Sequence, residues 1–113
     1  MKRIFKACKY SVAGLIEACK HEAAFRQELL LVMVGAVALG MLDLSGALKC
    51  LLGFSLVLIL IVELINTAIE NIVDRIGTEY NLLSKRAKDI GSAAVFLTIL
   101  SVVALWICVL FVI

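Results

Sequence analysis

Acidic and amide side chains follow one another at helical spacing in one stretch of the sequence, VELINTAIENIVD, which spans residues 62–74. At about 100° per residue, Glu63, Asn66, Glu70 and Asp74 fall on one face of a helix. No Pro or Gly separates them from the uncharged run CLLGFSLVLILI before them, so we expect one helix that changes from wholly apolar to two-faced. Carboxylate and amide oxygens are the ligands that a divalent cation such as Mg²⁺ prefers. The pattern therefore favours a cation site.

Two further groups of charges accompany this stretch. Glu22, Arg26 and Glu28 occur in HEAAFRQE, and Lys88 and Asp89 occur in SKRAKDIGSAA. Each group directly precedes an apolar run, so all of them would meet at one edge of a membrane, where ionisable residues are costly and usually functional. Their convergence strengthens the interpretation of this edge as a functional site.

Each group also has an ordinary structural interpretation. The acids of the first stretch could pair with Arg75 or Lys88. Glu22 and Arg26 could form an intrahelical pair, which stabilises a helix by only ~0.2–0.5 kcal/mol. Ser84 and the charges after it could simply begin a solvated helix.

The composition requires a lipid environment. The chain has 113 residues, 64% of them hydrophobic, and a mean hydropathy of +1.12. A globular chain of this size exposes too much surface to hide so many apolar side chains. It has no Pro and none of the alternating ~10-residue segments of a β-barrel, so we expect an all-α membrane protein with a single domain over residues 1–113.

Hydrophobic periodicity and apolar runs predict four helices. A basic amphipathic helix at about residues 3–26 is expected to lie in the membrane interface, or else to pack on its own bundle. Membrane spans are expected at about residues 28–48, 50–73 and 90–113. Four cysteines lack metal-type spacing and are interpreted as small buried apolar side chains: Cys8, Cys19, Cys50 and Cys108.

The distribution of Lys and Arg predicts the orientation. Six of the 11 basic residues lie within the first 27 residues, four lie in the loop at residues 75–89, and only Lys49 lies between the first two spans. By the positive-inside rule, the N-terminus and the 75–89 loop face the cytoplasm and the C-terminus faces outward.

The sequence resembles a known family. ELINTAIENIVD at residues 63–74 meets every fixed position of the signature of the prokaryotic diacylglycerol kinases, and HEAAFRQE and RAKDIGSAAV are also similar to that family. The resemblance covers nearly the whole chain. It implies a homotrimeric helical bundle in the bacterial inner membrane, which transfers the γ-phosphate of MgATP to diacylglycerol and gives phosphatidic acid. The implied partners are ATP, diacylglycerol, membrane lipids and further copies of the chain, with no nucleic acid.

The resemblance also implies roles for individual residues. Glu63 would be the catalytic base, Asn66 would orient the site, and Glu22 and Glu70 would bind Mg²⁺. The implied nucleotide contacts are Arg3, Tyr10, Glu22, Glu70, Glu79, Tyr80, Asn81, Lys88 and Asp89. The implied lipid contacts are Arg3, Ser11, Arg26, Glu28, Glu63, Ser92 and Trp106. Asn81 departs from the His that relatives often carry, and Val12 and Ala13 replace a Trp and a Lys, which affects substrate detail more than chemistry.

Other functions fit parts of the pattern. Undecaprenol kinase shares the acidic signature, although EAAFRQE and DRIGTEY look more like the diacylglycerol branch. A small ion-coupled transporter would need acids in the middle of a span and usually an even number of spans. A structural or regulatory subunit would use the acidic face for docking. The soluble phosphate-binding motifs GxxxxGK[ST] and GxGxxG are absent.

Overall fold

The computed structural model describes all 113 residues, and the chain is helical with no strand. The elements are α1 (Lys2–His21), α2 (Ala23–Met41), α3 (Gly46–Ile76), α4 (Leu82–Ile107) and η1 (Cys108–Val112), a final π-helical turn. The predicted all-α fold is confirmed.

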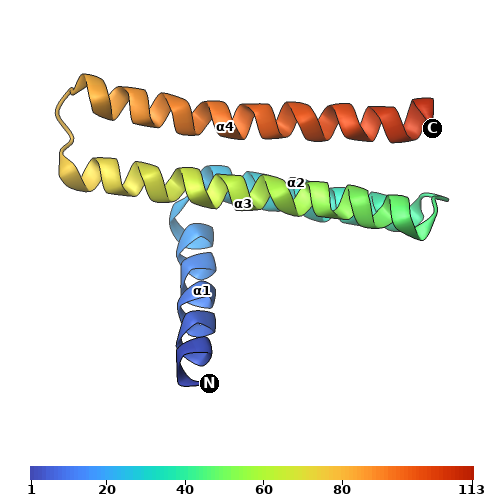
Figure 1. Cartoon of the computed structure of the whole chain (residues 1–113), viewed down its shortest axis with the longest axis horizontal. Helices are drawn as coiled ribbons and strands as arrows, with labels where there is room; N and C mark the ends of the chain where they lie inside the picture. The colour runs from blue at the N-terminus through green and yellow to red at the C-terminus, as the bar shows by residue number, and fades with distance from the viewer.

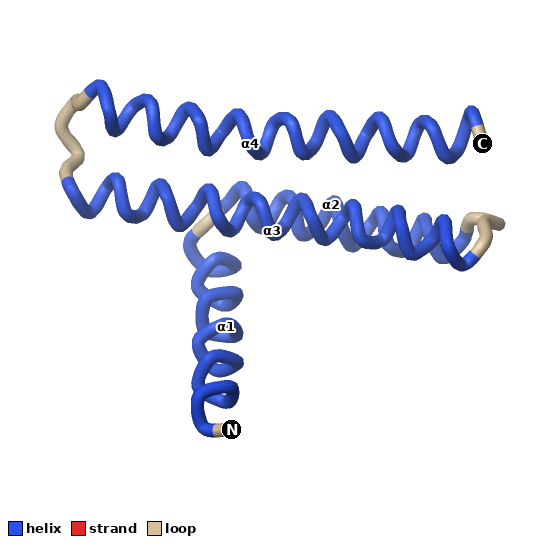
Figure 2. Tube along the Cα trace, viewed as in Figure 1, coloured by secondary structure: helices blue, strands red, loops and turns tan.

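Three helices run alongside one another and the first points away from them (Figure 1). The central helix is α3, which packs against both α2 and α4. Short loops separate the three helices, and the C-terminus lies at the same end as the α2–α3 loop (Figure 2). Most side chains of α1 are exposed, with Ala18 its one buried residue, so its apolar stripe is not covered by the bundle.

The three helices that run alongside one another, α2, α3 and α4, have the properties of membrane spans. The segments Ala23–Met41, Gly46–Ile76 and Leu82–Val112 are each long and apolar enough to cross a membrane. At ~1.5 Å per residue, the 31 residues of α3 extend for about 46 Å, which exceeds the ~30 Å thickness of the hydrocarbon core. One end of α3 therefore has room for polar residues outside that core, and the chain is a membrane protein.

The first helix ends earlier than predicted. Its last residue is His21, because Glu22 adopts an extended backbone with φ −115° and ψ 106° before α2 begins at Ala23. Arg26 satisfies the free carbonyls at this break, since its Nη1 donates to the oxygens of Cys19 at 3.0 Å and Lys20 at 3.1 Å. This use of Arg26 replaces the intrahelical pair with Glu22 that its spacing allowed.

The last helix begins eight residues before the predicted span. Asn81 is its N-cap, and Oδ1 of Asn81 accepts hydrogen bonds from the backbone N–H groups of Leu83 at 2.9 Å and Ser84 at 3.2 Å. The interpretation of Ser84 as the helix start is therefore wrong. Ser84 lies inside the first turn, and the preceding Asn supplies the cap.

Far from the acids, a hydrogen bond joins α3 to α4, and a small apolar cluster joins α2, α3 and η1. Nε1 of Trp106 donates to Oγ of the buried Ser55 at 3.0 Å, and Leu39, Leu52 and Val109 pack together nearby. The cysteines do not belong to this core. Cys8, Cys50 and Cys108 are exposed on the chain and Cys19 is partly buried, so the prediction of buried cysteines is wrong.

Loss of the Ser55 hydroxyl should alter the environment of Trp106, the only tryptophan in the chain. Ser55→Ala leaves the indole N–H without an acceptor, so we expect tryptophan emission to shift to shorter wavelength. The free energy of unfolding should fall by about 0.5–2 kcal/mol, the range for hydrogen bonds between membrane helices. Ser101→Ala on the exposed side of α4 is the control, and identical emission in both variants would contradict the assignment.

Two replacements of Asn81 test whether its capping oxygen stabilises α4. Asn81→Ala removes the cap and should cost about 0.5–2 kcal/mol of stability, whereas Asn81→Ser preserves a capping oxygen and should cost far less. Thermal unfolding of both variants in detergent micelles, followed by circular dichroism, measures the difference. Equal midpoints for the two variants would rule out the cap as a source of stability.

Candidate functional site

The face of α3 that packs against its neighbours changes from apolar to polar along its length. Leu52, Leu56 and Ile59 are buried on this face, and at the same helical spacing they are followed by Glu63 and Asn66. Glu63 is 5% exposed and Asn66 is 8% exposed. The polar residues therefore occupy positions that are otherwise part of the packing core.

The Glu63 carboxyl group lies among other carboxyl groups. Glu28 on α2 is a close neighbour of it, and Glu70 and Glu22 are near enough for their charges to act on it. None of these four acids pairs with a basic side chain, and Oε2 of Glu28 is buried without a hydrogen-bond partner. Carboxylates gathered in an apolar bundle repel one another unless a proton or a cation lies among them.

Asn66 connects to the next acid along the same face. Its Nδ2 donates to Oε1 of Glu70 at 2.9 Å, while its own Oδ1 is buried without a partner. Glu63, Asn66 and Glu70 thus share one face as their spacing predicts. The amide restrains the Glu70 carboxylate on the face that also carries Glu63.

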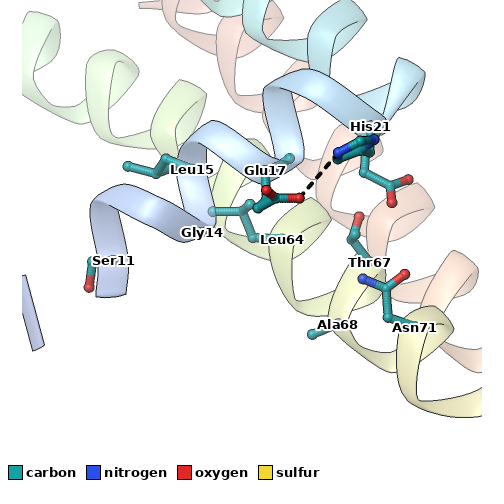
Figure 3. A pocket seen from close by; sticks show the side chains of 11 residues that line it. Ser11, Gly14, Leu15, Glu17, His21, Leu64, Thr67, Ala68 and Asn71 are labelled. Atoms are coloured by element: carbon teal, nitrogen blue, oxygen red, sulfur yellow. Dashed lines mark ion pairs between the residues drawn. The ribbon is translucent and has the colours of Figure 1, made fainter. Parts of the chain in front are cut away.

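A hollow of about 740 Å³ lies between α1 and α3 next to these acids. Glu22 lines it at the α1–α2 break, and Thr67 and Asn71 line it from α3. Figure 3 shows Thr67 and Asn71 near the His21 end of α1, where His21 pairs with Glu17 at 3.3 Å. Thr67 and Asn71 were not among the predicted site residues, although the helical angles that select Glu63 and Glu70 place both next to that face.

Within one chain the acids do not form a complete metal site. No group of three or more His, Cys, Asp or Glu residues is placed to hold an ion. Glu22 and Glu70 both lie near Glu63, and the donor set of carboxylate and amide oxygens is of the type that Mg²⁺ prefers. Mg²⁺ is usually bound through one or two carboxylates together with substrate phosphates and water, so these residues fit that ion.

The predicted nucleotide contacts other than Glu22 and Glu70 fall on two separate surfaces of the chain. One hollow, of about 340 Å³, lies at the α3–α4 loop and brings together Glu79, Tyr80, Asn81, Lys88 and Asp89. Another, of about 490 Å³, lies on α1 and is lined by basic residues with Arg3 and Tyr10 among them. Within one chain the two sets do not share a hollow.

Ion pairs order the first of these surfaces. Nζ of Lys88 lies 2.6 Å from Oδ1 of Asp74, and Nζ of Lys85 lies 2.7 Å from Oδ2 of Asp89. The alternative interpretation of the acidic stripe therefore holds for Asp74, which pairs with Lys88 and joins the end of α3 to α4. It does not hold for Glu63 or Glu70.

The predicted lipid contacts are spread along the bundle. Arg26 and Glu28 lie at the start of α2, Ser11 lines the α1–α3 hollow, and Ser92 is exposed on α4. Trp106 lies toward the opposite end of α4, in a groove of about 290 Å³ formed by α2, α3 and α4.

This groove is apolar and leads to the acids. Eleven of its 12 lining residues are hydrophobic. Two of them, Leu31 and Ile59, lie about one helical turn from Glu28 and Glu63 respectively. The apolar groove therefore comes within about one helical turn of Glu28 and Glu63, and the α1–α3 hollow, with Glu22, Thr67 and Asn71 in its lining, lies on another side of α3.

Comparisons with known proteins show the family of this chain. The profile of the family described as prokaryotic diacylglycerol kinase matches residues 9–110. The diacylglycerol kinase of Escherichia coli (strain K12) is 50% identical over 108 residues, which cover 96% of this chain and 88% of that protein. The diacylglycerol kinases of Pseudomonas aeruginosa and Haemophilus influenzae are 44% and 40% identical, over 97% and 98% of this chain and 89% and 94% of their own lengths. This chain belongs to the prokaryotic diacylglycerol kinase family.

Proposed function

We propose that this chain is an ATP-dependent lipid kinase that transfers the γ-phosphate of MgATP to the primary hydroxyl of diacylglycerol and yields phosphatidic acid. The observation that carries the proposal is the buried Glu63 carboxyl group. It lies one helical turn from Ile59, which lines an apolar groove, and next to Leu64, which lines the α1–α3 hollow, in a chain of this family. A lipid hydroxyl and a nucleotide phosphate have to meet at such a junction.

Glu63 acts as the general base in this proposal. It takes the proton of the lipid hydroxyl while that oxygen forms a bond to the γ-phosphorus and the bond from this phosphorus to ADP breaks. Burial keeps water from competing for the phosphoryl group. The neighbouring carboxyl group of Glu28 restricts where the lipid headgroup can lie.

Glu22 and Glu70 would hold Mg²⁺, and Asn66 keeps Glu70 in place through its amide hydrogen bond. When bound, Mg²⁺ supplies neutralisation of phosphate charge, which phosphoryl transfer needs more than covalent chemistry. The ion would also relieve the repulsion among the carboxylates around Glu63. The surface at the α3–α4 loop, which includes Lys88, would bind the phosphates and the base of the nucleotide.

A homotrimer would complete the site. The two sets of proposed nucleotide contacts lie on separate surfaces of one chain, and no three of its His, Cys, Asp or Glu side chains are placed to hold an ion. Large apolar side chains such as Phe54 and Ile65 remain exposed along α3, where a second copy could pack. Neighbouring copies would bring a second surface to each acidic cluster.

The proposed location is the bacterial inner membrane, with the N-terminus and the 75–89 loop in the cytoplasm. The basic residues concentrate in these two segments, and ATP is available on that side. The amphipathic α1 would then lie in the cytoplasmic interface, where the hollow beside Glu22 can receive the nucleotide.

Undecaprenol kinase activity is the second candidate because it requires the same acidic face. The apolar groove beside Glu63 would accept either lipid. The relatives from Escherichia coli, Pseudomonas aeruginosa and Haemophilus influenzae are named diacylglycerol kinases, which favours the first candidate.

A mixed-micelle assay with γ-labelled ATP tests the proposal. Diacylglycerol and undecaprenol are offered in parallel, and the labelled lipids are separated by chromatography. We expect label in phosphatidic acid. Transfer only to undecaprenol would select the second candidate, and transfer to neither lipid would remove the kinase proposal.

Glu63→Gln should abolish turnover while the fold and MgATP binding remain. The amide cannot accept the hydroxyl proton, so kcat should fall by about 10²–10⁴-fold, the usual contribution of a general base. Equilibrium binding of a fluorescent ATP analogue measures retention of the nucleotide. Wild-type turnover in this variant would show that another group is the base.

Glu70→Gln should raise the Mg²⁺ concentration needed for half-maximal activity. The substituted side chain still offers an oxygen to the Asn66 amide, so the change removes charge and leaves that hydrogen bond possible. We expect an increase of at least about tenfold, since even outer-shell partners of metal ions contribute 10–100-fold to affinity. Asp43→Asn, in the loop at the far end of α2, is the control, and an unchanged Mg²⁺ dependence in Glu70→Gln would exclude this residue as a ligand.

A further inference from the structure

Gly91 on α4 lies directly against the side chain of Asn66 on α3. Gly91 is buried, and a Cβ atom added there would overlap Oδ1 of Asn66. Asn66 itself is 8% exposed, so its carboxamide has little free space elsewhere. The missing side chain of Gly91 therefore provides the room that the carboxamide occupies.

The direction of the Asn66 carboxamide follows from its other contact. Nδ2 donates to Oε1 of Glu70 at 2.9 Å. A carboxylate can only accept, so the amide nitrogen has to face Glu70 and the amide oxygen has to face away from it. That oxygen points to Gly91 and has no hydrogen-bond donor. Space at Gly91, and not a second hydrogen bond, permits this orientation.

The helix that carries Gly91 is fastened on both sides of this contact. Toward one end Lys88 pairs with Asp74, and toward the other Trp106 donates to Ser55. Sliding of α4 along α3 would break one or both contacts. A methyl group at Gly91 is therefore accommodated more readily by movement of the carboxamide, the mobile end of a short side chain, than by movement of the helix.

We propose that Gly91 is a positioning residue for phosphoryl transfer, an inference that rests on the proposed function. Its lack of a side chain allows Asn66 to hold the Glu70 carboxylate through the amide hydrogen bond. A methyl group at this position displaces the carboxamide, and Glu70 then loses its donor while the helices stay packed. Gly91 acts through Asn66 and does not touch substrate.

The kinetic test compares two Gly→Ala variants of the full chain in mixed micelles. Gly91→Ala should lower kcat by at least about tenfold and raise the Mg²⁺ requirement, because misplacing a reacting group by about 1 Å can cost about a hundredfold. Gly40→Ala on α2 is the matched control, since an added Cβ there meets nothing within 4 Å, and it should leave both quantities unchanged. Equal kinetics in the two variants would overturn the proposal.

A spectroscopic test reads the position of Asn66 without activity. The chain contains only three asparagines, Asn66, Asn71 and Asn81, so selective ¹⁵N-asparagine labelling yields three side-chain NH₂ signals. Asn66→Ser identifies the Asn66 signal by its loss. Gly91→Ala should move this signal and leave the Asn71 and Asn81 signals in place. A lowered kcat with an unmoved Asn66 signal, or a moved signal with unchanged kcat, would also overturn the proposal.

The contact between Gly91 and Asn66 can still be tested if the chain is inactive or if Gly91→Ala does not fold. If the wild-type chain phosphorylates neither lipid, the proposed function fails, and the NMR comparison alone decides whether Gly91 orients Asn66. If Gly91→Ala does not fold, the double variant Asn66→Ala with Gly91→Ala removes the overlap. Recovery of the fold in the double variant supports the contact, and continued failure to fold refutes it.

Discussion

Burial of the Glu63 carboxyl group is the constraint around which the bundle is organised. An ionised group inside an apolar bundle is costly unless other groups or ions compensate it. The chain places Glu63 on the packing face of α3, where Leu52, Leu56 and Ile59 occupy the preceding positions. Glu22, Glu28 and Glu70 are its charged neighbours, and no basic side chain pairs with it.

The other polar contacts hold the helices that carry these acids. Arg26 caps the end of α1 and permits the sharp break at Glu22, which brings that acid to the edge of the α1–α3 hollow. Asp74 and Lys88 join α3 to α4 beyond the buried part of the acidic face. Exposed pairs of this type contribute only about 0–1 kcal/mol, so their importance lies in the register of the two helices more than in stability.

The position of the acids gives the proposed chemistry its two compartments. The apolar groove of α2, α3 and α4 comes within about one turn of Glu63, and the α1–α3 hollow, which Glu22 lines, includes Leu64 and Thr67 of the same helix. Diacylglycerol and ATP differ so strongly in polarity that they could not share one uniform pocket. A single chain supplies part of each binding surface, and the proposed trimer would supply the remainder.

Much of this molecule follows from the sequence alone. Composition requires lipid, apolar runs of ~20 residues predict helices that span it, and the spacing of Glu63, Asn66 and Glu70 puts them on one face, because helical geometry depends only on local backbone structure. Only the tertiary structure decided which groups meet across helices. It paired Asp74 with Lys88, directed Arg26 to carbonyls instead of Glu22, placed Glu28 against Glu63 and set Gly91 against Asn66. Those contacts depend on the rotation and register of whole helices, which no local pattern of residues specifies.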